Sequence, residues 1–185
     1  MSLRPGSILS LRYLSLPLIC MAAPAVAEVV ASDERGFVSR HEIDVSATPD
    51  AVWAALVRPE LYWNGDHSWS GNAANFTLSP RAGGCFCERL TDEGGGGSVE
   101  HARVVMAQPG RRLVMRGALG PLQAEAVVGT LVVELADDKA GGTRMRWTYT
   151  VGGYGSYPMQ SLSDPVDGVI GEQARRLAAH LDRGG

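Results

Sequence analysis

The sequence predicts an α+β fold in which a curved antiparallel sheet of about seven strands wraps on a long C-terminal helix. From residue 76 onward, short β-rich segments are separated by Gly and Pro turns, as is typical of an antiparallel sheet. The last of them, residues 143–151, alternates apolar and polar side chains, so one face of the sheet is expected to be buried. The only long amphipathic segment, residues 163–182, is left to cover that face.

Residues 1–27 are predicted to be a secretory signal peptide. Arg4 and Arg12 flank the start of an apolar run over 14–21, and Ala25-Val26-Ala27 is an A-x-A cleavage site. The run is too short to span a bilayer permanently, so we expect no integral membrane segment in the mature chain. We therefore expect a periplasmic or secreted protein after removal of the leader near Ala27.

The remaining residues, 28–185, are expected to form a single domain. The chain of 185 residues has 45% hydrophobic residues, which is enough for a core, and a formal net charge of −3. No basic stretch indicates a nucleic-acid-binding surface. The oligomeric state is not predicted by any feature of the sequence.

The first strand and two short helices open the domain. Residues 37–46 alternate as a half-buried strand, and Thr48-Pro49-Asp50 begins a short helix over 51–57. Pro59 ends that helix and opens a second short one over 60–63. The segment 64–75 is predicted to be a polar loop.

The rest of the sheet is expected to be a meander of strands joined by short turns. The first of these strands begins at Phe76, and the others are predicted over 85–90, 99–107, 113–119, 124–135 and 143–151. In the last strand, Met145, Trp147, Tyr149 and Val151 share the face that is expected to be buried.

The long helix over 163–182 is predicted from capping and periodicity. Asp164 is expected to cap its first turn, and Pro165 to take the first helical position. An apolar stripe follows at helical spacing: Val166, Ile170, Ala174, Leu177 and Leu181. Gln173 interrupts this stripe. It is expected either to hydrogen bond a neighbouring group or to point into a cavity under the helix.

Cys85 and Cys87 are the cysteines that remain once the leader has been removed with Cys20. An oxidising compartment favours a disulfide, but residues two apart on a strand lie near the upper limit of disulfide Cα spacing. We therefore favour two free thiols over a bridge. The four histidines show no metal-ligand spacing, so neither a metal site nor a cofactor is predicted.

Several stretches of the chain resemble one superfamily. Ile43-x-Val45-x-Ala47-x-Pro49-x-x-Val52-Trp53 is similar to the opening strand and helix of START-like (SRPBCC) domains, and Pro80–Gly84 and Gln108–Leu113 are similar to their hairpins. This group includes polyketide cyclases, lipid-transfer domains and heat-shock ATPase activator-like domains. Gly83–Glu88 and Gly117–Gln123 resemble a branch of exported bacterial proteins known mainly as uncharacterised. The resemblance implies the helix-grip fold.

A cavity is expected between the curved sheet and the C-terminal helix, as such folds usually retain one. Since neighbours alternate on a strand, residues 85–90 turn either the two cysteines or Phe86 and Glu88 inward, and we favour the second arrangement. The candidate ligand-binding residues are Trp69, Phe86, Glu88, Met115, Trp147, Tyr149, Tyr157 and Gln173. Tyr157 lies in a glycine-containing segment that is either a gate or an ordinary packed loop.

Three functions are compatible with these residues. The favoured one is an exported, non-catalytic binder of a small apolar or amphipathic molecule. The second is a cyclase- or dehydratase-like enzyme with Glu88, His101 or Tyr149 as acid–base groups, which requires these side chains to lie within hydrogen-bond reach. The third is a protein-interaction module that uses Trp63 and Trp69 as an exposed patch.

Overall fold

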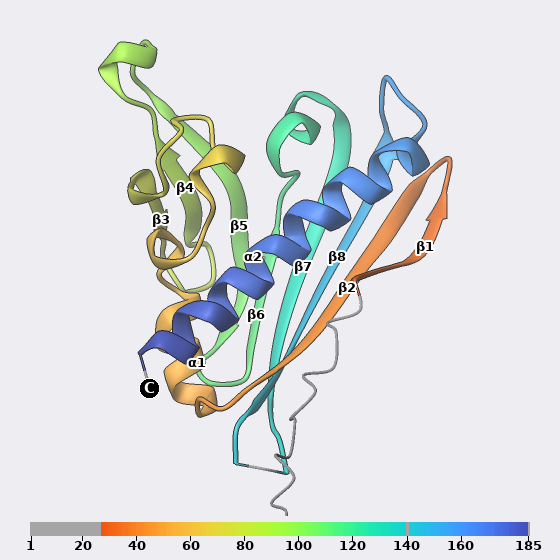
Figure 1. Cartoon of the computed structure of the whole chain (residues 1–185). Coiled ribbons are helices and arrows are strands. Elements are labelled where there is room, and N and C mark those ends of the chain that lie inside the picture. The colour runs from red at the N-terminus through yellow and green to blue at the C-terminus, as the bar shows by residue number, and fades with distance from the viewer. Residues whose placement is uncertain (1–26, 140, 185) are drawn as a thin grey trace, which may run out of the picture.

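The computed structural model describes residues 27–139 and 141–184, so the predicted signal peptide lies outside the described residues except for Ala27. These residues form an eight-stranded antiparallel sheet with α2 across one face (Figure 1). The strand order is β1-β2-β8-β7-β6-β5-β4-β3. The strands are β1 (Ala27–Asp33), β2 (Gly36–Val45), β3 (Phe76–Leu78), β4 (Cys85–Arg89), β5 (Ser98–Gln108), β6 (Arg112–Arg116), β7 (Ala126–Asp137) and β8 (Thr143–Tyr154).

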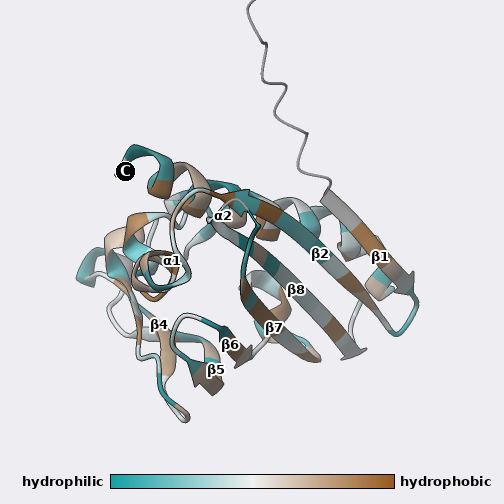
Figure 2. Ribbon diagram, turned by 90° about the horizontal axis from the view of Figure 1, so that it is seen from below, coloured by the Kyte–Doolittle hydropathy of each residue, from teal (hydrophilic) through white to brown (hydrophobic). Residues whose placement is uncertain are grey.

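The expected fold class is therefore confirmed, with one strand more than the seven predicted. The additional strand, β1, pairs antiparallel with β2 at the edge of the sheet. The sheet curves around the helices, from β4 on one side to β1 on the other (Figure 2). Along β8 the burial alternates as the sequence predicts, and Trp147 and Tyr149 face the core.

Short helical turns connect the strands. The helix α1 (Pro49–Leu56) is capped by the Thr48 hydroxyl, which accepts from the backbone N–H of Ala51 at 3.4 Å. The second predicted helix is the 3-10 turn η1 (Pro59–Leu61). The other 3-10 turns are η2 (Gly65–His67), η3 (Ala73–Asn75), η4 (Asp92–Gly94), η5 (Gly120–Ala124) and η6 (Met159–Leu162).

The helix α2 (Ser163–Arg183) packs Ile170, Ala174 and Leu177 against the sheet, as its apolar stripe predicts. The expected cap was wrong, because the carboxylate of Asp164 makes no capping hydrogen bond. The turn η6 runs directly into α2, and its Gln160 carbonyl accepts from the backbone N–H of Ser163. Pro165 is consequently the third helical residue, still in the first turn where its missing N–H is tolerated.

A buried polar contact fixes α2 against β2. The Ser39 hydroxyl donates to Asp167 Oδ1 at 2.6 Å, and His41 Nε2 lies 3.0 Å from the same oxygen. Gly171 permits this close approach, since a Cβ on it would overlap the His41 ring. Burial lowers the pKa of His41, although the Asp167 carboxylate opposes that effect.

Within residues 27–139 and 141–184, no helix combines the length and the apolar character needed to cross a bilayer.

Candidate functional site

A cavity of about 480 Å³ lies beside the N-terminal half of α2. Three elements enclose it: the first two turns of α2, the loop that follows η1, and the segment around η5. The apolar lining residues are Trp63, Trp69, Leu119, Pro121, Leu122, Leu162, Pro165, Val166, Val169 and Ile170. Of the eight ligand-binding residues that the sequence predicts, Trp69 and Tyr157 line this cavity.

The middle of the space between sheet and helix is filled, contrary to our expectation. Phe86, Met115, Trp147 and Tyr149 are buried at 5% exposure or less and do not line the cavity. The reason is aromatic packing. Trp147 meets the ring of Tyr62 edge-on, with centroids 6.3 Å apart.

A second aromatic cluster closes the core next to the cavity. The ring centroids of Phe86 lie 5.1 Å from Trp63 and 5.3 Å from Phe76. The imidazole of His101 packs on both phenylalanines, at 5.1 Å from Phe76 and 5.3 Å from Phe86. Trp63 and His101 of this cluster line the cavity, whereas Phe76 and Phe86 do not.

Gln173 is fully buried and bonds to neighbouring backbone instead of pointing into the cavity. Its Oε1 accepts from the backbone N–H of Asn64 at 2.8 Å, and its Nε2 donates to the Val169 carbonyl at 3.2 Å. Gln173 is not among the residues that line the cavity. It ties the loop that forms one cavity wall to α2.

That wall, loop 64–70, is held by carboxylates at both ends. On the α2 side, Glu172 accepts from Asn64 Nδ2 at 2.7 Å and lies 3.0 Å from His67 Nε2. On the sheet side, Glu88 accepts from the backbone N–H groups of Trp69 and Ser70 at 3.1 and 2.5 Å. The position of the wall thus depends on two acidic side chains.

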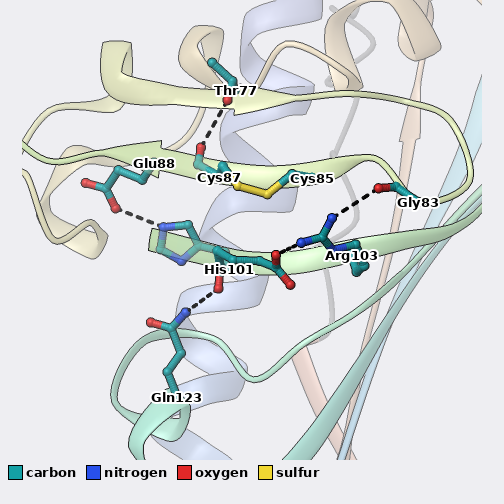
Figure 3. The surroundings of a disulfide bond; sticks show 9 residues. Thr77, Gly83, Cys85, Cys87, Glu88, His101, Arg103 and Gln123 are labelled. Atoms are coloured by element: carbon teal, nitrogen blue, oxygen red, sulfur yellow. Dashed lines mark hydrogen bonds and ion pairs between the residues drawn. A yellow bond between two sulfur atoms is a disulfide. The ribbon is translucent and has the colours of Figure 1, made fainter. Parts of the chain in front are cut away.

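Phe86 and Glu88 point inward from β4, as we favoured. Glu88 Oε2 lies 2.9 Å from His101 Nε2, and both side chains are buried, at 1% and 5% exposure (Figure 3). Burial by itself would raise the pKa of Glu88, but hydrogen bonds from Ser70, Trp69 and His101 lower it overall. Burial lowers the pKa of His101, with Glu88 opposing. The pair is therefore a carboxylate beside a neutral imidazole at neutral pH.

Glu88 and Phe86 do not line the cavity themselves, whereas His101 does. The sequence names Glu88 and His101 only as separate candidate acid–base residues. The structure brings them together, and of the two only His101 lines the cavity.

The hydroxyl of Tyr149, the third candidate acid–base residue, is hydrogen bonded to backbone groups. Its hydroxyl donates to the Gly117 carbonyl at 3.2 Å and accepts from the Leu119 N–H at 3.1 Å. Burial raises its pKa to about 12. Tyr149 therefore positions the segment that leads into η5 and does not reach the cavity.

Cys85 and Cys87 form a disulfide, which corrects our preference for free thiols. Their Cα atoms are 5.4 Å apart, closer than the roughly 6.6 Å of residues two apart in a regular strand. The pairing of β4 with β5 shifts register between Phe86 and Cys87, because β5 carries one extra residue, His101, opposite this step. The Cα spacing of the two cysteines lies within the range of disulfides. The bridge lies beside Glu88 in the same strand (Figure 3).

The mouth of the cavity carries two exposed aromatic side chains. Trp69 and Tyr157 are 56% and 64% exposed. Trp69 Nε1 donates to Gln123 Oε1 at 2.9 Å, which links loop 64–70 to η5. Trp63 is 5% exposed and donates from Nε1 to the His67 carbonyl, so the expected Trp63–Trp69 surface patch is reduced to one tryptophan.

Two parts of the site were missed at the sequence level. The η5 segment has apolar residues in a turn, Leu119 and Leu122, which was a usable signal. The other part, Ser39, His41 and Asp167, lies outside the cavity and supports α2 on β2; its signal was two polar residues on the inner face of a predicted strand. Among the described residues, no group of three or more His, Cys, Asp or Glu is arranged to hold a metal ion.

A family profile described as "Polyketide cyclase / dehydrase and lipid transport" matches residues 37–182. No functionally curated protein matches the sequence. Solved structures similar to this one include MLL2253 from Mesorhizobium loti, with 20% identity, a TM-score of 0.56, and 80% of this chain and 98% of that chain covered.

Two further structures have the same fold. Mll3558 from Rhizobium loti is 26% identical, with a TM-score of 0.53, and 78% of this chain and 96% of that chain are covered. An uncharacterized protein from Rhizobium leguminosarum is 20% identical, with a TM-score of 0.55, and 87% of this chain and 99% of that chain are covered.

Proposed function

Because the chain belongs to the Polyketide cyclase / dehydrase and lipid transport family, an SRPBCC-type family, we propose that it binds a small apolar or amphipathic molecule in this cavity. The observation that carries the proposal is the cavity itself. Its volume of about 480 Å³ is within the range of ligand sites, roughly 300–1,000 Å³, and its lining is mostly apolar.

The test is whether an apolar probe binds in the cavity and whether a bulky side chain placed in the cavity prevents that binding. The uncharged fluorophore N-phenyl-1-naphthylamine should bind saturably to the protein. Val169→Trp, on the half-buried cavity face of α2, should abolish that binding by filling the space. Ala179→Trp, on the exposed face of the same helix, is the matched control and should leave binding unchanged. Equal binding by both variants would remove the support for the cavity as the site.

A second candidate function is proton transfer on the bound molecule. It is favoured by one observation, the hydrogen bond between Glu88 and His101 at the cavity wall. A neutral imidazole whose Nε2–H is held by a carboxylate can accept a proton at Nδ1, and the carboxylate then stabilises the imidazolium.

An apolar methyl ketone, 2-acetylnaphthalene, tests the second candidate. In deuterated water the protein should accelerate deuterium uptake at its methyl group by about 100-fold or more over background, as expected of a general base. His101→Gln should lose the acceleration while probe binding is retained. Uptake at the background rate with saturated protein would exclude this activity.

We propose further that the protein acts in the periplasm or outside the cell. The support is the signal-peptide pattern of residues 1–27 together with the Cys85–Cys87 disulfide, which suits an oxidising compartment. N-terminal sequencing of the protein from the periplasmic fraction should give Glu28 as the first residue. A chain that keeps residues 1–27 and stays in the cytoplasm would contradict the proposal.

A further inference from the structure

Two acidic side chains line the cavity. Asp66 and Glu125 supply carboxylates, and no lysine or arginine is found among the described lining residues. Glu125 Oε2 accepts from the backbone N–H and the hydroxyl of Ser156 at 2.7 and 3.1 Å. Its Oε1, like the carboxylate of Asp66, makes no hydrogen bond with any residue that the structure describes. Both carboxylates can therefore still bind a ligand.

The inner wall of the cavity adds a hydrogen-bond acceptor. The Glu88 carboxylate can only accept, so the proton of the neutral His101 ring lies on Nε2, and Nδ1 keeps a free lone pair. In Figure 3 one ring nitrogen of His101 points to Glu88 and the other points away from it. Within the described part of the chain Nδ1 has no partner, although His101 is only 5% exposed and lines the cavity.

The basic side chains near the cavity already have hydrogen-bond partners. The Arg176 side chain donates to the Tyr62 carbonyl at 2.7 Å, and the His67 ring is paired with Glu172 at 3.0 Å. The N-terminal end of α2 would favour an anion through its dipole, but Asp164 and Asp167 supply negative charge there.

Aromatic side chains complete the lining. Trp63, Trp69 and Tyr157 border the cavity together with the two carboxylates. Faces of indole and phenol rings attract cations.

From these observations we infer, on the basis of the proposed binding function, that the cavity selects an apolar molecule that carries an ammonium group and rejects the corresponding carboxylate. The ammonium group would donate to His101 Nδ1 or to the carboxylates of Asp66 and Glu125, while the apolar part contacts the α2 side chains. A carboxylate in the same place would face the lone pair of His101 and the negative charge of Asp66 and Glu125.

Three naphthalene compounds that differ in one group test this inference: 1-naphthylmethylamine, 1-naphthalenemethanol and 1-naphthaleneacetate. Isothermal titration calorimetry at pH 7.5 should give the tightest binding for the amine, then the alcohol, then the carboxylate. The amine should bind at least about tenfold more tightly than the carboxylate, because like charges placed together in a site are strongly unfavourable.

The double variant Asp66→Asn/Glu125→Gln tests whether the two carboxylates are responsible for the preference for an ammonium group. It should weaken amine binding and strengthen carboxylate binding. Glu134→Gln, on the far face of the sheet, changes the net charge without touching the cavity and should behave as wild type. Carboxylate binding equal to or tighter than amine binding, or an unchanged amine affinity in the double variant, would overturn the inference and leave the binding function standing. Failure of all three compounds and of N-phenyl-1-naphthylamine to bind would overturn both.

Discussion

Glu88 is the residue on which the cavity wall most depends, and Glu88→Gln should therefore weaken both stability and binding. Its carboxylate accepts from the backbone N–H groups of Trp69 and Ser70 and lies in hydrogen-bond contact with His101. Glutamine has nearly the same shape but replaces one accepting oxygen by an NH2 group. That group would face an N–H donor, so at least one contact is lost and the others lose their charge.

The expected cost follows from the type of hydrogen bond and from burial. Hydrogen bonds to charged groups contribute roughly 1.5–3 kcal/mol each, and a buried donor without a partner costs a similar amount. With Glu88 at 1% exposure, the variant should lose about 3–4 kcal/mol of the free energy of unfolding.

Glu172→Gln is the matched control, since Glu172 binds the other end of the same loop. Its side chain is 32% exposed, so water can replace the lost contacts and the cost should stay below about 1 kcal/mol. Urea denaturation followed by circular dichroism measures both variants, and probe fluorescence measures binding. Equal losses in the two variants, or full binding by Glu88→Gln, would refute the reasoning that the buried carboxylate fixes loop 64–70.

The two glycines of α2 should respond to alanine in opposite directions. Gly168→Ala should raise the free energy of unfolding by about 0.5–1 kcal/mol, because it adds helix propensity and no atom lies within 4 Å of the new Cβ. Gly171→Ala should lower it by about 1–3 kcal/mol through overlap with the His41 ring, and thermal unfolding checks both. Acid should also weaken the fold. Burial lowers the pKa of His41 and His101 from the ordinary 6.5. The contribution of the two neutral histidines to the free energy of unfolding is therefore fully present above about pH 6.5, and it is lost as the pH falls towards their folded pKa values. The free energy of unfolding should change by at most about 1.4 kcal/mol per pH unit for each histidine. Urea titrations across this pH range should show a smaller dependence on pH for His101→Gln than for the wild type. Replacing both residues of the Cys85–Cys87 bridge by alanine should cost at most about 1.6 kcal/mol, because the closed loop is very short, as chemical denaturation can verify.

The sheet and its covering helix were predictable because their signals are periodic. Alternation along β8 and the stripe of α2 each repeat over many residues, so a few exceptions do not obscure them. The edge strand β1 was missed because it directly follows the predicted leader. The α2 cap was missed because the η6 turn replaces a side-chain cap by a backbone carbonyl.

The position of the cavity could not be predicted, because it depends on three-dimensional packing. The sequence shows that Trp147 and Phe86 face inward, but not that Tyr62 and Trp63 lie close enough to fill the space beside them. The disulfide was missed for a related reason. The Cα atoms of the two cysteines lie closer together than in the regular strand that sequence reasoning assumed.

The open space lies beside the first turns of α2 because the two ends of the helix meet different partners. Around Leu177 the helix packs on apolar side chains, which adjust until they fill the space. Around Val169 it faces loop 64–70, whose distance from the helix is set by hydrogen bonds to Gln173, Glu172 and Glu88. Hydrogen bonds have fixed lengths and directions, so this loop cannot collapse onto the helix to close the gap. The cavity should therefore persist without a ligand, and substitutions of the polar residues that hold the loop should change its volume more than substitutions within the apolar core around Leu177.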